Sequence, residues 1–101
     1  MAGFRVAGNW DALQSNRTRA SFHIEQRNGT FGGTASHSDG KVRGHGEGMV
    51  EGNQFHFRVE WNDGTIGVYN GTFGLDGVLT GVAFDERHPS SQATWRSNTA
   101  F

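Results

Sequence analysis

The residues of this chain that could hold or act on another molecule are few, and most of them stand beside turns. His37, Trp61 and Asp85 each end a segment in which apolar and polar residues alternate, and Tyr69 follows shortly after Trp61. Aromatic rings stack on planar or sugar-like ligands, while an imidazole and a carboxylate supply hydrogen-bonding anchors. Trp95 adds a further aromatic side chain. We therefore predict a ligand-binding site formed by His37, Trp61, Tyr69, Asp85 and Trp95.

The same residue types also allow general acid–base chemistry. His37, Asp85 and His88 could exchange protons with a substrate in an isomerisation or a cyclisation. No nucleophile motif, phosphate-binding loop or set of metal ligands supports an enzyme, however. His45 and Glu47 lie on one alternating segment, but two such groups without a third are more typical of a solvated strand face than of a zinc site. We expect no catalytic residue, metal or cofactor, and retain a small acid–base enzyme as an alternative.

The composition argues against several classes of partner. The 101 residues carry a net charge of −1, which leaves no basic surface to neutralise phosphates. No stretch is apolar enough to span a membrane, and cysteine is absent. We expect neither a nucleic-acid nor a membrane partner. The opening MAGFRVAGNW is too short and polar for a signal peptide, so we expect a cytoplasmic protein, or a secreted one if a leader precedes this sequence.

Short strands are the elements that must position these residues. Sixteen glycines, one proline, eight Phe, three Trp and one Tyr favour strands and turns over helices. Alternation recurs in eight segments, at residues 4–12, 19–26, 30–37, 42–50, 54–61, 65–73, 78–85 and 92–97. Turn residues separate them and join neighbours as antiparallel hairpins. We predict one all-β domain over residues 1–101, an eight-stranded antiparallel up-and-down β-barrel, with a two-sheet β-sandwich as the alternative.

The connections predict a closed and an open end of this barrel. Those after the second, fourth and sixth strands are tight (RNG, EG, LDG), while QSNRT, HSDGK, NDG and DERHPSS after the other strands are mostly longer or more polar. His37, Trp61 and Asp85 fall at the open end. Small inward residues there leave space above a filled interior, so we expect a half-filled barrel. His37 and Asp85 should face each other across its mouth, too far apart to bond directly.

Two hairpins carry predictions of register. A two-residue loop Glu51-Gly52 would place Gly44, Gly46 and Gly48 opposite Val59, Phe57 and Phe55. A three-residue loop Asn62-Asp63-Gly64, with Gly64 at positive φ, would turn Gly67, Tyr69, Gly71 and Phe73 inward. Ile66 and Val68 then lie outside, beside Val78, Val82 and Phe84. This outer apolar patch predicts a homo-oligomer, a dimer or tetramer, that associates through the sixth and seventh strands.

Several framework segments resemble those of the avidins and, more distantly, of the lipocalin-type barrels. They are the opening Gly8-Asn9-Trp10, the run NGTFGGT and the segments FRVEW and YNGTF. The resemblance implies a small calycin-type β-barrel. Carried over by position, Trp61 and Tyr69 resemble the aromatic box around the avidin ligand, and His37 takes a position that hydrogen-bonds it.

The resemblance fails at the polar residues that select biotin. Where avidins place an asparagine, a serine and a tyrosine that bond the ureido oxygen, this chain has Ala12, Ala20 and Ala35. Loss of several convergent hydrogen bonds removes most of the specificity for such a ligand. We therefore expect a non-enzymatic barrel that binds another small molecule or a short glycan at its open rim. A further alternative is a protease inhibitor or lectin-like module that works through exposed loops such as residues 85–91.

Overall fold

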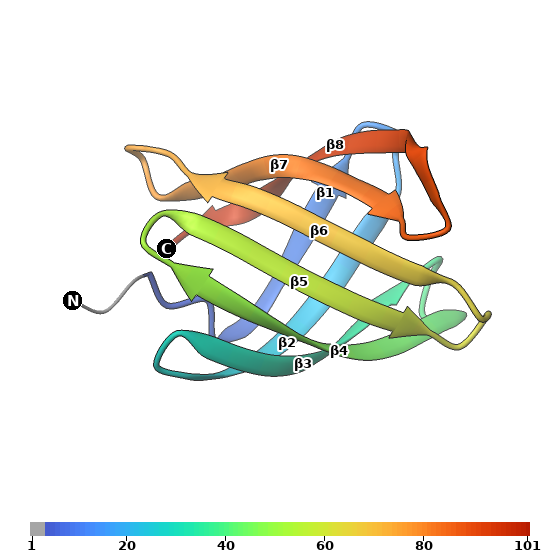
Figure 1. Ribbon diagram of the computed structural model, residues 1–101, viewed down its shortest axis with the longest axis horizontal. Helices are drawn as coiled ribbons and strands as arrows, with labels where there is room; N and C mark the ends of the chain where they lie inside the picture. Colours follow the sequence, from blue (N-terminus) through green and yellow to red (C-terminus); the bar gives the residue numbers. More distant parts are fainter. Residues whose placement is uncertain (1–3) are drawn as a thin grey trace.

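A closed ring of eight antiparallel strands makes up residues 4–101, the part of the chain that the computed structural model describes (Figure 1). The strands are β1 (Gly8–Gln14), β2 (Arg19–Arg27), β3 (Thr30–His37), β4 (Val42–Glu51), β5 (Gln54–Trp61), β6 (Ile66–Phe73), β7 (Val78–Asp85) and β8 (His88–Ala100). Each pairs with its neighbours in sequence, and β1 pairs with β8 to close the ring. The predicted up-and-down barrel is confirmed and the sandwich is excluded. No helix that could cross a membrane occurs in the described residues.

Aromatic rings fill the interior of the barrel from its closed end, which we call the bottom, to about the middle. Trp10 lies at the centre of this cluster, edge-on to Phe22 and Phe101 at 5.0 Å between ring centroids and stacked on Trp95 at 6.3 Å. Such offset and edge-to-face pairs are the favoured arrangements of aromatic rings. Phe57 and Val59 of β5 are fully buried beside them. The alternation seen in the sequence therefore assigns one face of each strand to this core.

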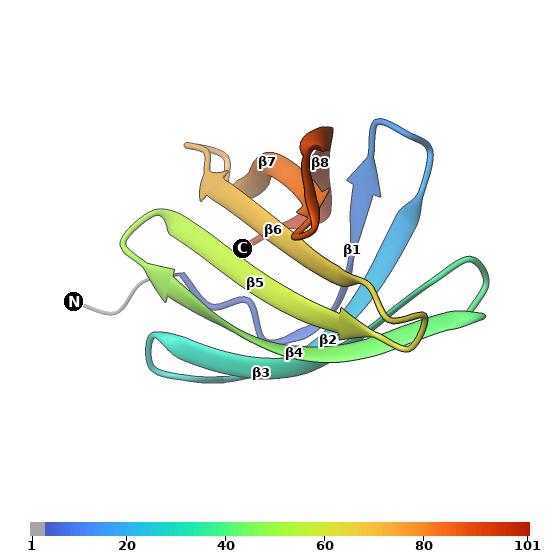
Figure 2. The same cartoon turned by 45° about the vertical axis from the view of Figure 1, so that its right-hand side comes forward.

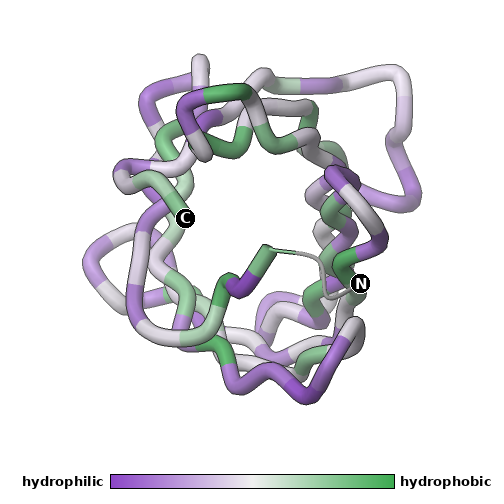
Figure 3. Tube along the Cα trace, turned by 90° about the vertical axis from the view of Figure 1, so that its left-hand side faces the viewer, coloured by the Kyte–Doolittle hydropathy of each residue, from purple (hydrophilic) through white to green (hydrophobic). Residues whose placement is uncertain are grey.

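The segment before β1 closes one end of the barrel. Residues 4–7 were expected to be part of the first strand, but Gly8 takes a φ of +110° and the strand begins there. Val6 is fully buried, its N–H is donated to Gln26 Oε1 at 2.7 Å, and its carbonyl accepts the indole N–H of Trp10 at 2.9 Å. Figure 3, which looks along the barrel from this end, shows the coloured tube before β1 reaching into the opening.

The turn between β4 and β5 differs from the prediction by one residue. The loop is Gly52-Asn53, not Glu51-Gly52, with Gly52 at a φ of +59°. Gly46 therefore pairs with Val59, and Gly48 with Phe57. This shift moves each partner by two residues, so every side chain keeps its predicted face. On the outside it pairs His45 with Glu60 and Glu47 with Arg58, which gives both polar pairs opposite charges when His45 is protonated.

The turn between β5 and β6 has the predicted form. Gly64 takes a φ of +87°, the Gly64 N–H is donated to the Trp61 carbonyl, and the Trp61 N–H is donated to the Thr65 carbonyl at 2.9 Å. Gly67, Tyr69, Gly71 and Phe73 are buried, as this three-residue loop requires. The loop therefore fixes which face of β6 forms the interior.

The last strand is longer than predicted. It covers His88–Ala100 rather than residues 92–97, and the connection from β7 is reduced to Glu86-Arg87. A register shift between Phe84 and Asp85 accommodates the extra residues of β8. Smaller differences add one or two residues to the ends of β1, β2 and β4 and remove Thr65 from β6. Figure 2 shows the β1–β2, β3–β4 and β5–β6 connections at the end of the barrel opposite the β2–β3 and β4–β5 connections.

Candidate functional site

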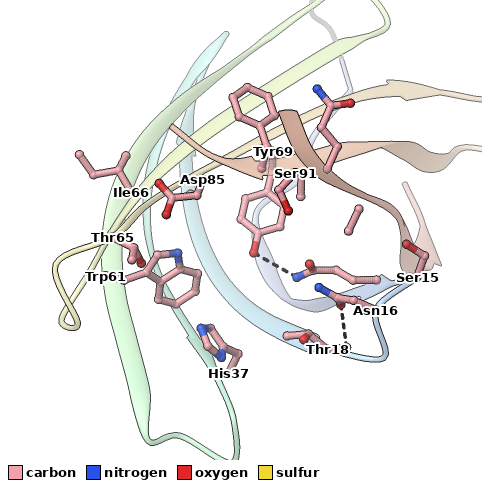
Figure 4. A pocket seen from close by; sticks show the side chains of 16 residues that line it. Ser15, Asn16, Thr18, His37, Trp61, Thr65, Ile66, Tyr69, Asp85 and Ser91 are labelled. Carbon is pink, nitrogen blue, oxygen red and sulfur yellow. Dashed lines mark hydrogen bonds between the residues drawn. The ribbon is translucent and has the colours of Figure 1, made fainter. Parts of the chain in front are cut away.

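A cavity of about 430 Å³ opens at the end of the barrel that the sequence predicted to be open. His37, Trp61, Tyr69 and Asp85 all line it (Figure 4). They come from the end of β3, the end of β5, the middle of β6 and the end of β7. The structure thus brings four of the five predicted site residues around one space, although their role in ligand binding stays a prediction.

The cavity exists because the inward residues beside Tyr69 and between it and the open end are small. Ala83 of β7 pairs with Ala93 of β8, and both line the space. Gly67 stands beside Trp61, where an added Cβ would lie 2.7 Å from the indole nitrogen. Because real Cβ atoms essentially never approach so closely, glycine at this position lets the indole lie flat against the wall. Large rings below and small residues above give the half-filled barrel that the sequence predicted.

Trp61 and His37 form one side of the cavity. Their ring centroids are 4.7 Å apart with an interplanar angle of 76°, so the rings meet edge to face. The Nδ1 atom of His37 lies 2.9 Å from Ser38 Oγ, which leaves its other nitrogen without a partner among residues 4–101. Trp61 is 8% exposed and presents its indole to the cavity. This side therefore offers an aromatic surface with one adjustable hydrogen-bonding group.

Tyr69 forms the floor. Its hydroxyl accepts a hydrogen bond from Gln14 Nε2 at 3.2 Å, and its ring packs edge-on against Phe22 and Trp95. Burial raises the pKa of Tyr69 to about 12, because the phenolate would lose its solvation. The phenol is consequently neutral at physiological pH and keeps its own proton to donate to a ligand.

Asp85 contributes a carboxylate at the end of β7, where it pairs with Gly67, the residue that stands beside Trp61. Its Oδ1 accepts the backbone N–H of Arg87 at 2.9 Å, and its Oδ2 lies 3.6 Å from Nδ1 of the exposed His88. The first contact is an Asx turn, which explains the residue locally but occupies only one oxygen. No hydrogen bond joins His37 to Asp85 in the described part of the chain, and their strands lie four apart in the ring of eight. Both residues line the cavity, and Figure 4 shows them on either side of Trp61; their facing each other across the mouth stays a prediction.

Trp95 lies below the cavity and does not line it. It is 3% exposed and donates its indole N–H to the Val82 carbonyl at 3.1 Å. Its ring packs against Phe55 and Tyr69 at 5.7 and 5.9 Å. The reason is depth: Trp95 pairs with Gly81, two positions below the Ala83–Ala93 pair that borders the space. Trp95 supports Tyr69 from beneath.

Sequence reasoning missed the polar residues of β1 and its connection. Gln14 lines the cavity together with Ser15, Asn16 and Thr18. Gln14 continues the inward positions of Trp10 and Ala12, so alternation alone could have found it had the first strand not been ended at residue 12. These groups add neutral donors and acceptors to the mouth. Residues 4–101 contain no group of three or more His, Cys, Asp or Glu side chains placed to hold a metal.

Two further carboxylates near the mouth are held in their charged form. Hydrogen bonds from the Thr65 hydroxyl and N–H lower the pKa of Asp63 below its ordinary value. Glu86 accepts two hydrogen bonds from the Arg58 guanidinium, both at 3.1 Å, and its pKa is lowered as a result. Asp63 and Glu86 therefore contribute negative charge around the open end at neutral pH, although Arg58 offsets that of Glu86.

The chain is similar in fold to two solved β-barrels. One is a redesigned β-barrel, mFAP1, bound to DFHBI, with a TM-score of 0.64 and 14% identity over 91% of this chain and 92% of that chain. The other is EF1p2_mFAP2b bound to DFHBI, with a TM-score of 0.59 and 12% identity over 91% of this chain and 90% of that chain. No protein-family model and no curated protein matches the sequence.

Proposed function

We propose that this protein is a non-enzymatic container that binds a small molecule or a short glycan at its open end. The observation that carries the proposal is the convergence of His37, Trp61, Tyr69 and Asp85 on one cavity of about 430 Å³. That volume falls within the range of about 300–1,000 Å³ common among ligand pockets. The two barrels of similar fold were each solved with a ligand, DFHBI, which supports this use of the architecture.

The aromatic residues of the avidin resemblance support this proposal, whereas the polar residues that avidins use to bind biotin are absent. Trp61 and Tyr69 border the cavity, as the avidin-like aromatic box requires. Ala12, Ala20 and Ala35 are buried within the apolar core and offer no hydrogen bond. A ureido group would find none of the convergent partners that select it. We propose a lipocalin- or avidin-like container whose ligand is not biotin.

Native mass spectrometry of protein purified from its own host tests the proposal directly. We expect a stoichiometric bound molecule that is released on denaturation. The same molecule, added to stripped protein, should change the tryptophan fluorescence, because Trp61 lines the cavity while Trp10 and Trp95 are buried in the core. Biotin added in the same way should leave the fluorescence unchanged.

Two substitutions locate the binding. Tyr69→Phe and His37→Ala should each weaken affinity by roughly tenfold, since each removes a hydrogen-bonding group from the cavity. His45→Ala is the matched control, because this exposed histidine lies on the outer face of β4. An empty host-derived protein whose fluorescence ignores a broad metabolite and glycan panel would contradict the proposal. It would favour an interaction protein that acts through its loops.

We also propose that copies of this protein associate through the outer face of β6 and β7. Val68 is 6% exposed although it points away from the core, and Ile66, Val82 and Phe84 are half-buried around it. Apolar side chains gathered on an outer sheet face are typical of a subunit contact. Because β1 pairs with β8 and closes the ring of strands in residues 4–101, we expect such a contact to be made face to face. The molecular mass in solution tests this proposal.

A further inference from the structure

The charges that line the cavity indicate what kind of ligand it takes. Asp85 is its one carboxylate, and no lysine or arginine of the described chain lines it. Arg58, which lies near the open end, is bound by Glu86. Tyr69 is neutral, as argued above from its burial. A ligand in this space therefore meets one fixed negative charge and no fixed positive charge from the lining.

The indole N–H of Trp61 is the second distinguishing feature. Trp10 and Trp95 donate theirs to backbone carbonyls at 2.9 and 3.1 Å, but within residues 4–101 the N–H of Trp61 has no acceptor. No fully buried side-chain nitrogen or oxygen in the described chain lacks a partner, so this N–H must be reached from the cavity. In Figure 4 it is turned toward the side on which Asp85 lies. A donor on a side chain that is 8% exposed favours a ligand with an acceptor.

We propose that the ligand is an aromatic organic cation: a flat ring that carries a protonated amine and a neutral hydrogen-bond acceptor. The ring packs against Trp61 and Tyr69, the ammonium group lies at the Asp85 carboxylate, and the acceptor receives the N–H of Trp61. The inference rests on the proposed function and narrows its ligand class. Attraction of a cation to a carboxylate and to aromatic faces in a partly enclosed space favours the charged ligand over its neutral analogue by about tenfold.

A charge series on one ring tests the proposal. Tyramine, tyrosol and para-hydroxyphenylacetate share a hydroxyphenyl ring and are cationic, neutral and anionic at neutral pH. Isothermal titration calorimetry should rank them in that order, with tyramine bound about tenfold more tightly than tyrosol. Phenethylamine, which lacks the hydroxyl group, should bind more weakly than tyramine. Added salt should weaken tyramine binding and leave tyrosol binding unchanged, because only the first depends on charge.

Asp85→Asn assigns the preference to one carboxylate. The amide retains an oxygen for the Arg87 N–H, so the Asx turn is kept while the charge is removed. We expect tyramine affinity to fall to that of tyrosol. Asp76→Asn is the matched control, because Asp76 accepts the Val78 N–H at 3.0 Å in the same kind of turn at the closed end. That variant should bind all three compounds as the parent does.

The possible failures are distinct. If para-hydroxyphenylacetate binds best, or if Asp85→Asn leaves the ranking unchanged, the charge inference is wrong while the cavity remains a binding site. If tyramine does not bind, the inference is equally wrong, and the proposed function then stands or falls with the ligand recovered from the host. An anionic ligand recovered from the host would also overturn the inference. Loss of all binding from host and panel would overturn both proposals together.

Discussion

At the scale of single residues, Tyr69 connects the filled core to the cavity. It is the one tyrosine of the chain, and its ring is held by Phe22 and Trp95 while its hydroxyl faces Gln14. Desolvation is the larger influence on its ionisation, and the hydrogen bond from Gln14 opposes it. The same burial that positions the hydroxyl for a ligand therefore keeps it protonated.

Tyr69 should make the fold sensitive to alkali. The phenol of an unfolded chain ionises near pH 10, whereas that of the folded protein ionises at about 12. Between these values the unfolded state loses the proton more readily than the folded state, so the free energy of unfolding should fall by roughly 2 kcal/mol as the pH rises from 10 to 12. Ultraviolet absorbance of tyrosinate follows the single group, and denaturant titration follows the stability.

Tyr69→Phe is the control for that measurement. It removes the ionisable group and leaves every other alkaline titration in place, so its stability should decline less over the same interval. An absorbance midpoint near pH 10 in the folded protein, or an equal decline in both proteins, would show that the phenol is not desolvated as described.

At the scale of elements, local turn chemistry predicted some registers and missed others. A three-residue loop over Asn62-Asp63-Gly64 needs a positive φ at its last residue, and that residue is glycine. The register between β5 and β6 was therefore predicted correctly. In the β4–β5 turn, both Glu51-Gly52 and Gly52-Asn53 contain the glycine, so the sequence alone does not choose between them. Both choices keep the same inward face, which is why the core was predicted although the partners were not.

The last strand was underestimated for a different reason. Pro89 and the serines after it have low strand propensity and were taken as a loop. Pairing with β7 and a register shift hold them in β8 nevertheless. A second shift, between Val78 and Thr80, leaves the Leu79 N–H to the Ser97 hydroxyl at 3.0 Å, and Ser97 donates in turn to the Thr99 carbonyl at 2.7 Å. Here a serine hydroxyl accepts the N–H that a backbone carbonyl of the neighbouring strand would otherwise accept, and no pattern in the sequence predicts this.

Ser97→Ala tests the importance of that replacement. Ser97 is 2% exposed, so alanine would leave the buried Leu79 N–H without a partner. We expect a loss of about 1–3 kcal/mol in the free energy of unfolding, measured by denaturant titration. Ser90→Ala, at an exposed position of the same strand, should change stability by no more than about 0.5 kcal/mol. Equal effects of the two substitutions would refute the role given to Ser97.

At the scale of the whole molecule, alternation predicted which residues face inward but not how far along the barrel each one lies. His37, Trp61 and Asp85 could be placed because they end strands at one rim. Trp95 has inward parity as well, yet it lies below the cavity, and Gln14 reaches the cavity because β1 extends to it. Depth depends on the stagger between strands around the closed ring, and that stagger depends on all eight registers together.

The outer face provides the prediction that concerns the complete molecule. Val82→Lys should place a charge within the apolar patch of Ile66, Val68, Val82 and Phe84 and so oppose burial of that patch against a second copy. By light scattering, we expect the parent to have a mass that is a multiple of 11.0 kDa and the variant to have 11.0 kDa. Thr34→Lys, on the exposed outer face of β3, should retain the mass of the parent.

Association of two copies should also change ligand affinity, because Ile66 and Phe84 belong both to the patch and to the cavity lining. Covering them with a second copy would shield one side of the mouth from water and strengthen the interactions inside it. Ligand affinity should therefore rise with protein concentration in the parent and stay constant in Val82→Lys. A parent protein that has a mass of 11.0 kDa at every concentration, with affinity independent of concentration, would show that this patch does not join copies of the chain.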